Sequence, residues 1–178
     1  MKKTILIAGI HGVGKTYYCS LINDEHFEHY TASSLIKRAS NLKIDNNKKV
    51  DDVNSNQQIL INAFKNLRDQ KETIFLFDGH FVLLDKDMKF QKISLDVFKE
   101  FNLSEIIILI DDVANVAKRL KDRDNKDHMT TELLYEMQNL ETEHGKFIAE
   151  ELHIPLHIIN LENDYADKEF ITRLSAYI

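Results

Sequence analysis

The chain has 178 residues, one cysteine and a formal net charge of −6, with 43% hydrophobic and 29% charged residues. This composition predicts one soluble globular domain with a sizeable core and excludes a disordered or disulfide-rich chain. The negative net charge argues against a surface that binds nucleic acid, and no apolar run approaches the roughly 20 residues that span a bilayer. The single cysteine, Cys19, fits a reducing cytoplasm.

The most informative motif directly follows the first short apolar run. Residues 4–8, Thr-Ile-Leu-Ile-Ala, predict a buried parallel strand, and residues 9–16 read Gly-Ile-His-Gly-Val-Gly-Lys-Thr. This is the phosphate-binding loop pattern of Gly, four residues and Gly-Lys-Ser/Thr, in which Lys15 reaches the β- and γ-phosphates and the Thr16 hydroxyl ligates Mg²⁺. We therefore predict a site for ATP and Mg²⁺, with a helix after the loop. The predicted nucleotide contacts in this segment are Gly9, His11, Gly12, Val13, Gly14, Lys15, Thr16 and Tyr17.

Short apolar runs alternate with helical patterns along the rest of the chain. The runs span residues 27–31, 73–78, 105–110 and 156–160. The three- and four-residue spacing of helices spans residues 53–67, 113–120, 130–152 and 166–177. Strands that alternate with helices predict a parallel sheet with helices on both faces. The polar segments 41–52 and 85–92 are expected to be exposed connections near the edge of the sheet where ligands bind.

The apolar run at 73–78 ends in a carboxylate, Asp78, which Gly79 follows. A carboxylate at a strand end beside a phosphate loop is the usual second half of a Mg²⁺–nucleotide site. Asp78 could alternatively orient or deprotonate an acceptor hydroxyl. A third interpretation is purely structural: Asp78 caps a turn with Gly79.

Two arginines, Arg119 and Arg123, are four residues apart near the end of the predicted helix at 113–120 and share one face. They could stabilise the charge on a transferring phosphoryl group. The alternative is a surface pair balanced by Asp122 and Asp124. The segment that follows, 124–128, is polar and is expected to be short and mobile.

These motifs together resemble the nucleoside-monophosphate kinases, the adenylate-kinase-like group of P-loop kinases. Tyr30-Thr31-Ala32-Ser33-Ser34-Leu35-Ile36-Lys37-Arg38 is similar to the segment that holds the acceptor monophosphate in those enzymes. Asp78-Gly79-His80 is similar to the end of their third strand, and Arg119-Leu120-Lys121-Asp122-Arg123 to the start of their lid. Ile158-Ile159-Asn160-Leu161-Glu162-Asn163 resembles the last strand and the turn that abuts the adenine ring.

The resemblance implies a three-layer P-loop NTPase fold with a five-stranded parallel sheet in one domain, 1–178. It implies a small acceptor-side insertion at about 32–71 and a short lid at about 121–130. The implied activity is transfer of the γ-phosphoryl group of ATP·Mg²⁺ to a nucleoside monophosphate or similar small acceptor. The implied catalytic residues are Lys15, Asp78, Arg119 and Arg123, with Thr16 and Asp78 at the metal. Further implied contacts are Arg119 and Asn160 to the nucleotide, and Thr31, Ser34, Lys37, Arg38 and His80 to the acceptor.

Two departures from the kinase pattern leave the acceptor open. Adenylate kinases follow Asp-Gly with an arginine that binds the acceptor phosphate, whereas His80 stands here, and the predicted helix at 130–152 has no arginine. One alternative is a kinase for a hydroxyl of a metabolite or polynucleotide end, activated by Asp78. Another is a slow ATPase or nucleotide-sensing module that regulates a partner protein. Asn54, Asn56 and Gln57 are candidates for reading an acceptor base, or simply an exposed helix start.

Overall fold

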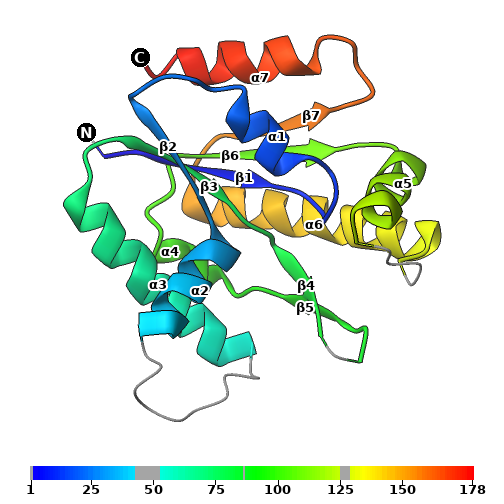
Figure 1. Ribbon diagram of the computed structural model, residues 1–178, viewed down its shortest axis with the longest axis horizontal. Coiled ribbons are helices and arrows are strands. Elements are labelled where there is room, and N and C mark those ends of the chain that lie inside the picture. The colour runs from blue at the N-terminus through cyan, green and yellow to red at the C-terminus, as the bar shows by residue number, and fades with distance from the viewer. Residues whose placement is uncertain (1, 43–52, 86, 125–128) are drawn as a thin grey trace.

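A parallel sheet forms the centre of the computed structural model, which describes residues 2–42, 53–85, 87–124 and 129–178 (Figure 1). Its order is β2-β3-β1-β6-β7. The strands are β1 (Thr4–Ala8), β2 (Phe27–Thr31), β3 (Ile74–Asp78), β6 (Glu105–Ile110) and β7 (Leu156–Asn160). All four neighbouring pairs are parallel, so the carboxyl ends of the strands meet at one edge.

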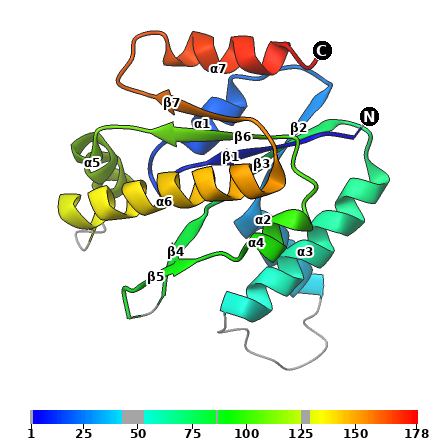
Figure 2. The same cartoon turned by 180° about the vertical axis from the view of Figure 1, so that it is seen from behind.

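Helices cover both faces of this sheet, as Figures 1 and 2 show from opposite sides. One face carries α1 (Lys15–Ser20) and α7 (Ala166–Ser175). The other carries α3 (Val53–Gln70), α4 (Leu95–Lys99) and most of α6 (Thr131–Leu152). The remaining elements are α2 (Ala32–Leu42), α5 (Val113–Asp124) and the antiparallel hairpin β4 (Val82–Leu84) with β5 (Phe90–Lys92).

The alternation of side chains along each strand divides the core into two halves. Ile5 and Ile7 of β1 pack in the cluster that includes Tyr18 of α1 and Phe170 of α7. Leu6 and Ala8 pack in the opposite cluster with Phe64, Phe98, Phe101 and Ile148. Because both faces are buried, the strands read as continuous apolar runs in the sequence.

The predicted fold class is confirmed: the chain is an α/β domain with five parallel strands and helices on both faces. The segment 85–92 differs from the expectation of a plain connection, since residues 90–92 form β5. Of the predicted connection 41–52, residues 43–52 lie outside the described residues, and so do residues 125–128 of the predicted lid. None of the helices in the described ranges is both long and apolar enough to cross a membrane.

Candidate active site

The loop between β1 and α1 has a backbone conformation that requires glycine. Gly9 and Gly12 have φ angles of 142° and 80°. A Cβ atom on Gly9 would lie 2.5 Å from the carbonyl oxygen of Leu109, and one on Gly12 would lie 2.7 Å from Cγ of Leu120. Side chains at these positions would therefore clash with the sheet and with α5. The loop can pass close to both elements because it carries glycines there.

Lys15, the first residue of α1, folds its side chain back under the loop. The side chain is 7% exposed, and its Nζ donates to the carbonyl oxygens of Gly9 at 2.8 Å and Ile10 at 3.3 Å. Nζ also lies 3.8 Å from Oδ1 of Asp78. Burial lowers the pKa of Lys15, and the charges of Asp78 and Glu141 oppose that shift. A phosphate oxygen could replace the loop carbonyls as the acceptor of this ammonium group.

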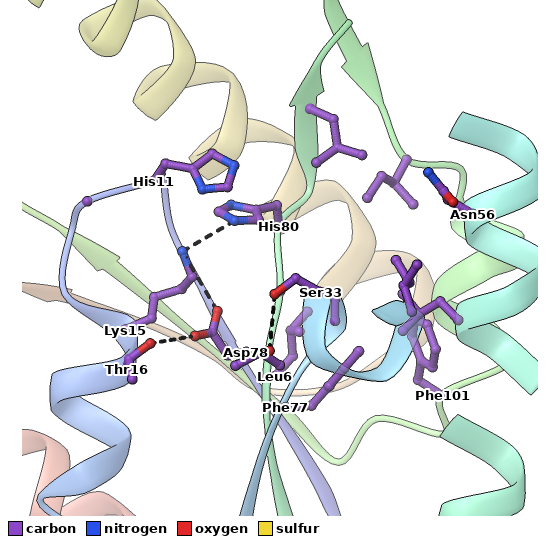
Figure 3. Close-up of a pocket in the computed structure, with 18 of the residues that line it drawn as sticks. Leu6, His11, Lys15, Thr16, Ser33, Asn56, Phe77, Asp78, His80 and Phe101 are labelled. Carbon is purple, nitrogen blue, oxygen red and sulfur yellow. Dashed lines mark hydrogen bonds and ion pairs between the residues drawn. The ribbon is translucent and has the colours of Figure 1, made fainter. Parts of the chain in front are cut away.

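Thr16 and Asp78 form the second polar pair of the site. Thr16 Oγ1 lies 3.4 Å from Oδ2 of Asp78, which is buried at the end of β3 (Figure 3). His29 Nε2 is 3.8 Å from the same carboxylate oxygen. A hydroxyl and a carboxylate are oxygen donors of the kind that Mg²⁺ takes beside phosphate oxygens and water. The residues present therefore fit the predicted metal, and Thr16 and Asp78 are the candidate protein ligands.

Arg119 links α5 to the phosphate loop. Its Nε donates to the carbonyl oxygen of Gly12 at 2.9 Å, and its Nη2 forms an ion pair with Oδ2 of the buried Asp111, directly after β6. Arg123, one turn later, is exposed, and its charge contributes to the lowered pKa of Lys15. Arg119 thus contacts the loop and Arg123 lines the cavity beside it, whereas Asp111, which positions Arg119, was not predicted.

Glu141 is a central residue of the site that the sequence analysis missed. This α6 carboxylate is 1% exposed and accepts hydrogen bonds from the backbone N–H groups of Gly9 (3.3 Å), Phe81 (2.9 Å) and Val82 (2.7 Å). Burial raises its pKa to about 7, against the effect of these N–H groups and of Lys15. The sequence did contain a signal for Glu141. It is an acidic residue on the apolar stripe of its helix, seven residues from both Leu134 and Ile148.

His80 lies between Lys15 and Glu141. Its Nε2 is 3.5 Å from Nζ of Lys15, and its Nδ1 is 3.9 Å from Oε1 of Glu141. Burial, followed by the charge of Lys15, lowers the pKa of His80 well below its ordinary value, so the ring is neutral at pH 7. The ring of His11 lies against it with centroids 4.1 Å apart (Figure 3). A neutral His80 can accept a hydrogen bond from the Lys15 ammonium group.

A cavity of about 630 Å³ extends from the phosphate loop into the space bordered by α2, α3, α4 and the β4–β5 hairpin. Its wall includes His11, Gly12, Gly14, Lys15, Thr16, Tyr17, Thr31, Asp78, His80, Arg119 and Arg123 from the predicted site. Gly9 and Val13, by contrast, belong to the loop without lining the cavity. Among the predicted acceptor contacts, Ser34, Lys37 and Arg38 have exposed side chains on α2 and do not line it.

Asn160 also lies outside the cavity wall. Its Oδ1 accepts a hydrogen bond from the backbone N–H of Glu162 at 3.1 Å, and so stabilises the turn that follows β7. The exposed Tyr17 hydroxyl lies 3.3 Å from Oδ2 of Asp167 on α7.

The family model AAA_17, described as an AAA domain, matches residues 8–133. This span covers more than two thirds of the chain and contains the loop, Asp78 and both arginines. The chain belongs to the AAA_17 family. The AAA_17 domain is thus of the P-loop, kinase-like type, which binds nucleotides and is associated with phosphotransfer.

Two solved structures have folds that match nearly the whole length of this AAA_17 chain. The tunicamycin resistance protein of Deinococcus radiodurans is 13% identical, with a TM-score of 0.58 over 98% of this chain and 96% of that one. TT1252 from Thermus thermophilus is 11% identical, with a TM-score of 0.59 over 99% and 97%. At these identities the likeness concerns the fold alone. No curated protein sequence matches the chain significantly.

Proposed function

We propose that this AAA_17 domain is an ATP-dependent phosphotransferase that passes the γ-phosphoryl group of ATP·Mg²⁺ to a small acceptor. The observation that carries this proposal is that one cavity joins the phosphate loop and Asp78 to a chamber beyond them, which α2, α3, α4 and the β4–β5 hairpin border. A phosphotransferase needs such a chamber to hold its acceptor in line with the γ-phosphate and away from water. A nucleotide switch or a simple ATPase has no need of it.

The roles of the side chains follow from their placement. Lys15 would bind the β- and γ-phosphates, and Thr16 and Asp78 would hold Mg²⁺. When bound, Mg²⁺ neutralises charge on the phosphate oxygens. Arg119 keeps the loop in place through the Gly12 carbonyl oxygen, and Arg123, at the same cavity, would stabilise the charge of the transferring group. Catalysis would rest on positioning and charge neutralisation, without a covalent enzyme intermediate.

This arrangement of side chains is compatible with both classes of acceptor that the sequence suggested. An adenylate-kinase-like enzyme would take a nucleoside monophosphate, and a hydroxyl kinase would take an alcohol that Asp78 can deprotonate. A slow ATPase that senses nucleotide for a partner protein would use the loop and leave the chamber without a substrate.

The test is acceptor-dependent phosphoryl transfer from γ-labelled ATP. The full chain is incubated with ATP·Mg²⁺ and pools of nucleoside monophosphates, nucleosides and small alcohols, and the labelled product is identified by mass spectrometry. We expect transfer to one class of acceptor at rates on the order of 1–100 s⁻¹. ADP and inorganic phosphate formed at the same slow rate with every pool would contradict the proposal and favour the nucleotide-sensing alternative.

A further inference from the structure

Among the described residues, the charged side chains that line the cavity come from α1, α5 and the end of β3. The cations are Lys15 of α1 and Arg119 and Arg123 of α5. Figure 3 places Lys15, Thr16 and Asp78 together, with Asn56 and Phe101 on the far side. In the part of the wall formed by described residues of α2, α3, α4 and the hairpin, there is no lysine or arginine. The cations are therefore placed to bind ATP rather than a second phosphate group.

The wall of the acceptor chamber is largely apolar. Its apolar residues include Ile36, Leu60, Phe77, Val97, Phe98 and Phe101. The rings pack on one another, with centroids 5.0 Å apart for Phe77 and Phe101 and 6.4 Å apart for Phe98 and Phe101. A phosphate dianion placed against this surface would lose its hydration without gaining a cation from the described residues of the wall, which is strongly unfavourable. An apolar or aromatic body would instead be stabilised by burial.

Asp78 adds a negative charge where the chamber meets the phosphate loop. It is the one carboxylate among the described residues that line the cavity. Lys15 Nζ, 3.8 Å away, balances part of this charge, and the carboxylate can accept a hydrogen bond from a hydroxyl group. Lys37 and Arg38, which the sequence suggested as acceptor-phosphate ligands, are exposed on α2 and do not offset this charge from within the wall.

Neutral polar groups complete the chamber. The amides of Asn56 and Gln57 lie at its α3 side, and the hydroxyl groups of Thr31 and Ser33 lie 3.2 Å apart at its α2 side. Such groups orient uncharged polar substituents of a ligand without demanding a counter-ion.

We infer that the acceptor is an uncharged alcohol with an apolar or aromatic body, rather than a nucleoside monophosphate; this inference rests on the proposed function, since it names the substrate class of the same site. In the reaction, the hydroxyl oxygen forms a bond to the γ-phosphorus and the bond from that phosphorus to the bridging oxygen of ADP breaks. ADP leaves with the electron pair. In this reaction Asp78 acts as the base rather than as a metal ligand, and Thr16 is the protein ligand of Mg²⁺. The hydroxyl proton passes to the Asp78 carboxylate and then to water, which leaves a phosphomonoester and ADP.

Equilibrium binding to the full chain loaded with Mg²⁺ and the non-hydrolysable analogue AMP-PNP tests this inference. The probes are four nucleosides with their 5′-monophosphates, and a series of phenyl- and indolyl-alkanols with their phosphate esters. We expect binding by at least one uncharged alcohol and by none of the phosphate esters. A 5′-monophosphate that binds more tightly than its nucleoside, or a panel in which no alcohol binds, would overturn the inference.

A matched pair of variants places the binding in the chamber. Ile36→Arg puts a cation into the wall, whereas Ile171→Arg makes the same change on the exposed surface of α7. Ile36→Arg should weaken binding of the alcohol at least about tenfold, which corresponds to roughly 1.4 kcal/mol of binding free energy. Ile171→Arg should leave the binding of the alcohol unchanged. Equal effects of the two variants would contradict the inference. Failure to bind AMP-PNP·Mg²⁺ in the same titration would contradict the proposed function itself, so the two failures are distinguishable.

Discussion

Glu141 connects three segments of the site through a single side chain. Its carboxylate accepts hydrogen bonds from the backbone N–H groups of Gly9, Phe81 and Val82. Gly9 and Glu141 are 132 residues apart in the sequence. The phosphate loop and the segment that follows Asp78 are therefore held in one arrangement by a buried carboxylate. These contacts are long-range, so the local pattern that marks Glu141 as an acid on an apolar stripe could not indicate its partners.

The ionisation of Glu141 makes stability depend on pH. Burial raises its pKa from 4.5 to about 7, so the folded chain holds this proton more tightly than the unfolded chain between those pH values. The contribution of this group to the free energy of unfolding is fully present below pH 4.5 and is lost as the pH rises to about 7. Wild type should thus become less stable relative to Glu141→Gln across that window.

Urea unfolding of wild type, Glu141→Gln and Glu136→Gln at several pH values between about 4.5 and 7 checks this prediction. Glu136 is exposed on the same helix, so its variant controls for the loss of one carboxylate. A difference between wild type and Glu141→Gln that stays constant over the window would show that the buried carboxyl does not titrate there.

At the scale of elements, the packing of the phosphate loop against α5 determines its shape. Arg119 binds the Gly12 carbonyl oxygen, and Gly12 itself lies under the side chain of Leu120. The loop is therefore shaped by its own glycines and also by α5, which begins only at Val113. Motion of α5 would move the loop with it.

Gly12→Ala should destabilise the domain and weaken ATP binding. The new Cβ atom would clash with Leu120, whose Cγ would lie 2.7 Å away. The backbone would also be strained, because an alanine rarely adopts the φ of 80° found at this position. The expected loss of unfolding free energy is about 1–3 kcal/mol. Adding Leu120→Ala removes the clash and leaves the strain, so the double variant should lose less than the two single losses added together. Strict additivity in urea unfolding would contradict this account.

The elements that the sequence predicted are those with long or continuous patterns. The run 105–110 is apolar throughout and the helix from 130 shows many repeats of its period, and both appear in the structure as β6 and α6. The hairpin strands β4 and β5 have three residues each and α4 has five, which is too short for either period to be recognised. These short elements border the acceptor chamber.

For the whole molecule, the side chains of the proposed nucleotide half could be picked out from the sequence, whereas the chamber of the proposed acceptor half could not. Lys15, Thr16 and Asp78 follow from a local motif and from the rule that parallel strands end at one edge. The chamber depends on how α2, α3, α4 and the hairpin pack together, and its apolar wall reads in the sequence as ordinary core. Lys37 and Arg38 matched a family pattern by position, but the side chains of α2 at these positions are exposed.

Calorimetric titration of ATP·Mg²⁺ into wild type, Lys15→Ala and Lys65→Ala tests the central claim most directly, because every proposed role depends on nucleotide binding at this loop. Lys65 lies exposed on α3 and serves as the matched control. We predict that wild type and Lys65→Ala bind alike, and that Lys15→Ala remains folded and binds at least about tenfold more weakly, since it loses a charge-assisted contact to phosphate. Equal affinity of Lys15→Ala and wild type would contradict the account.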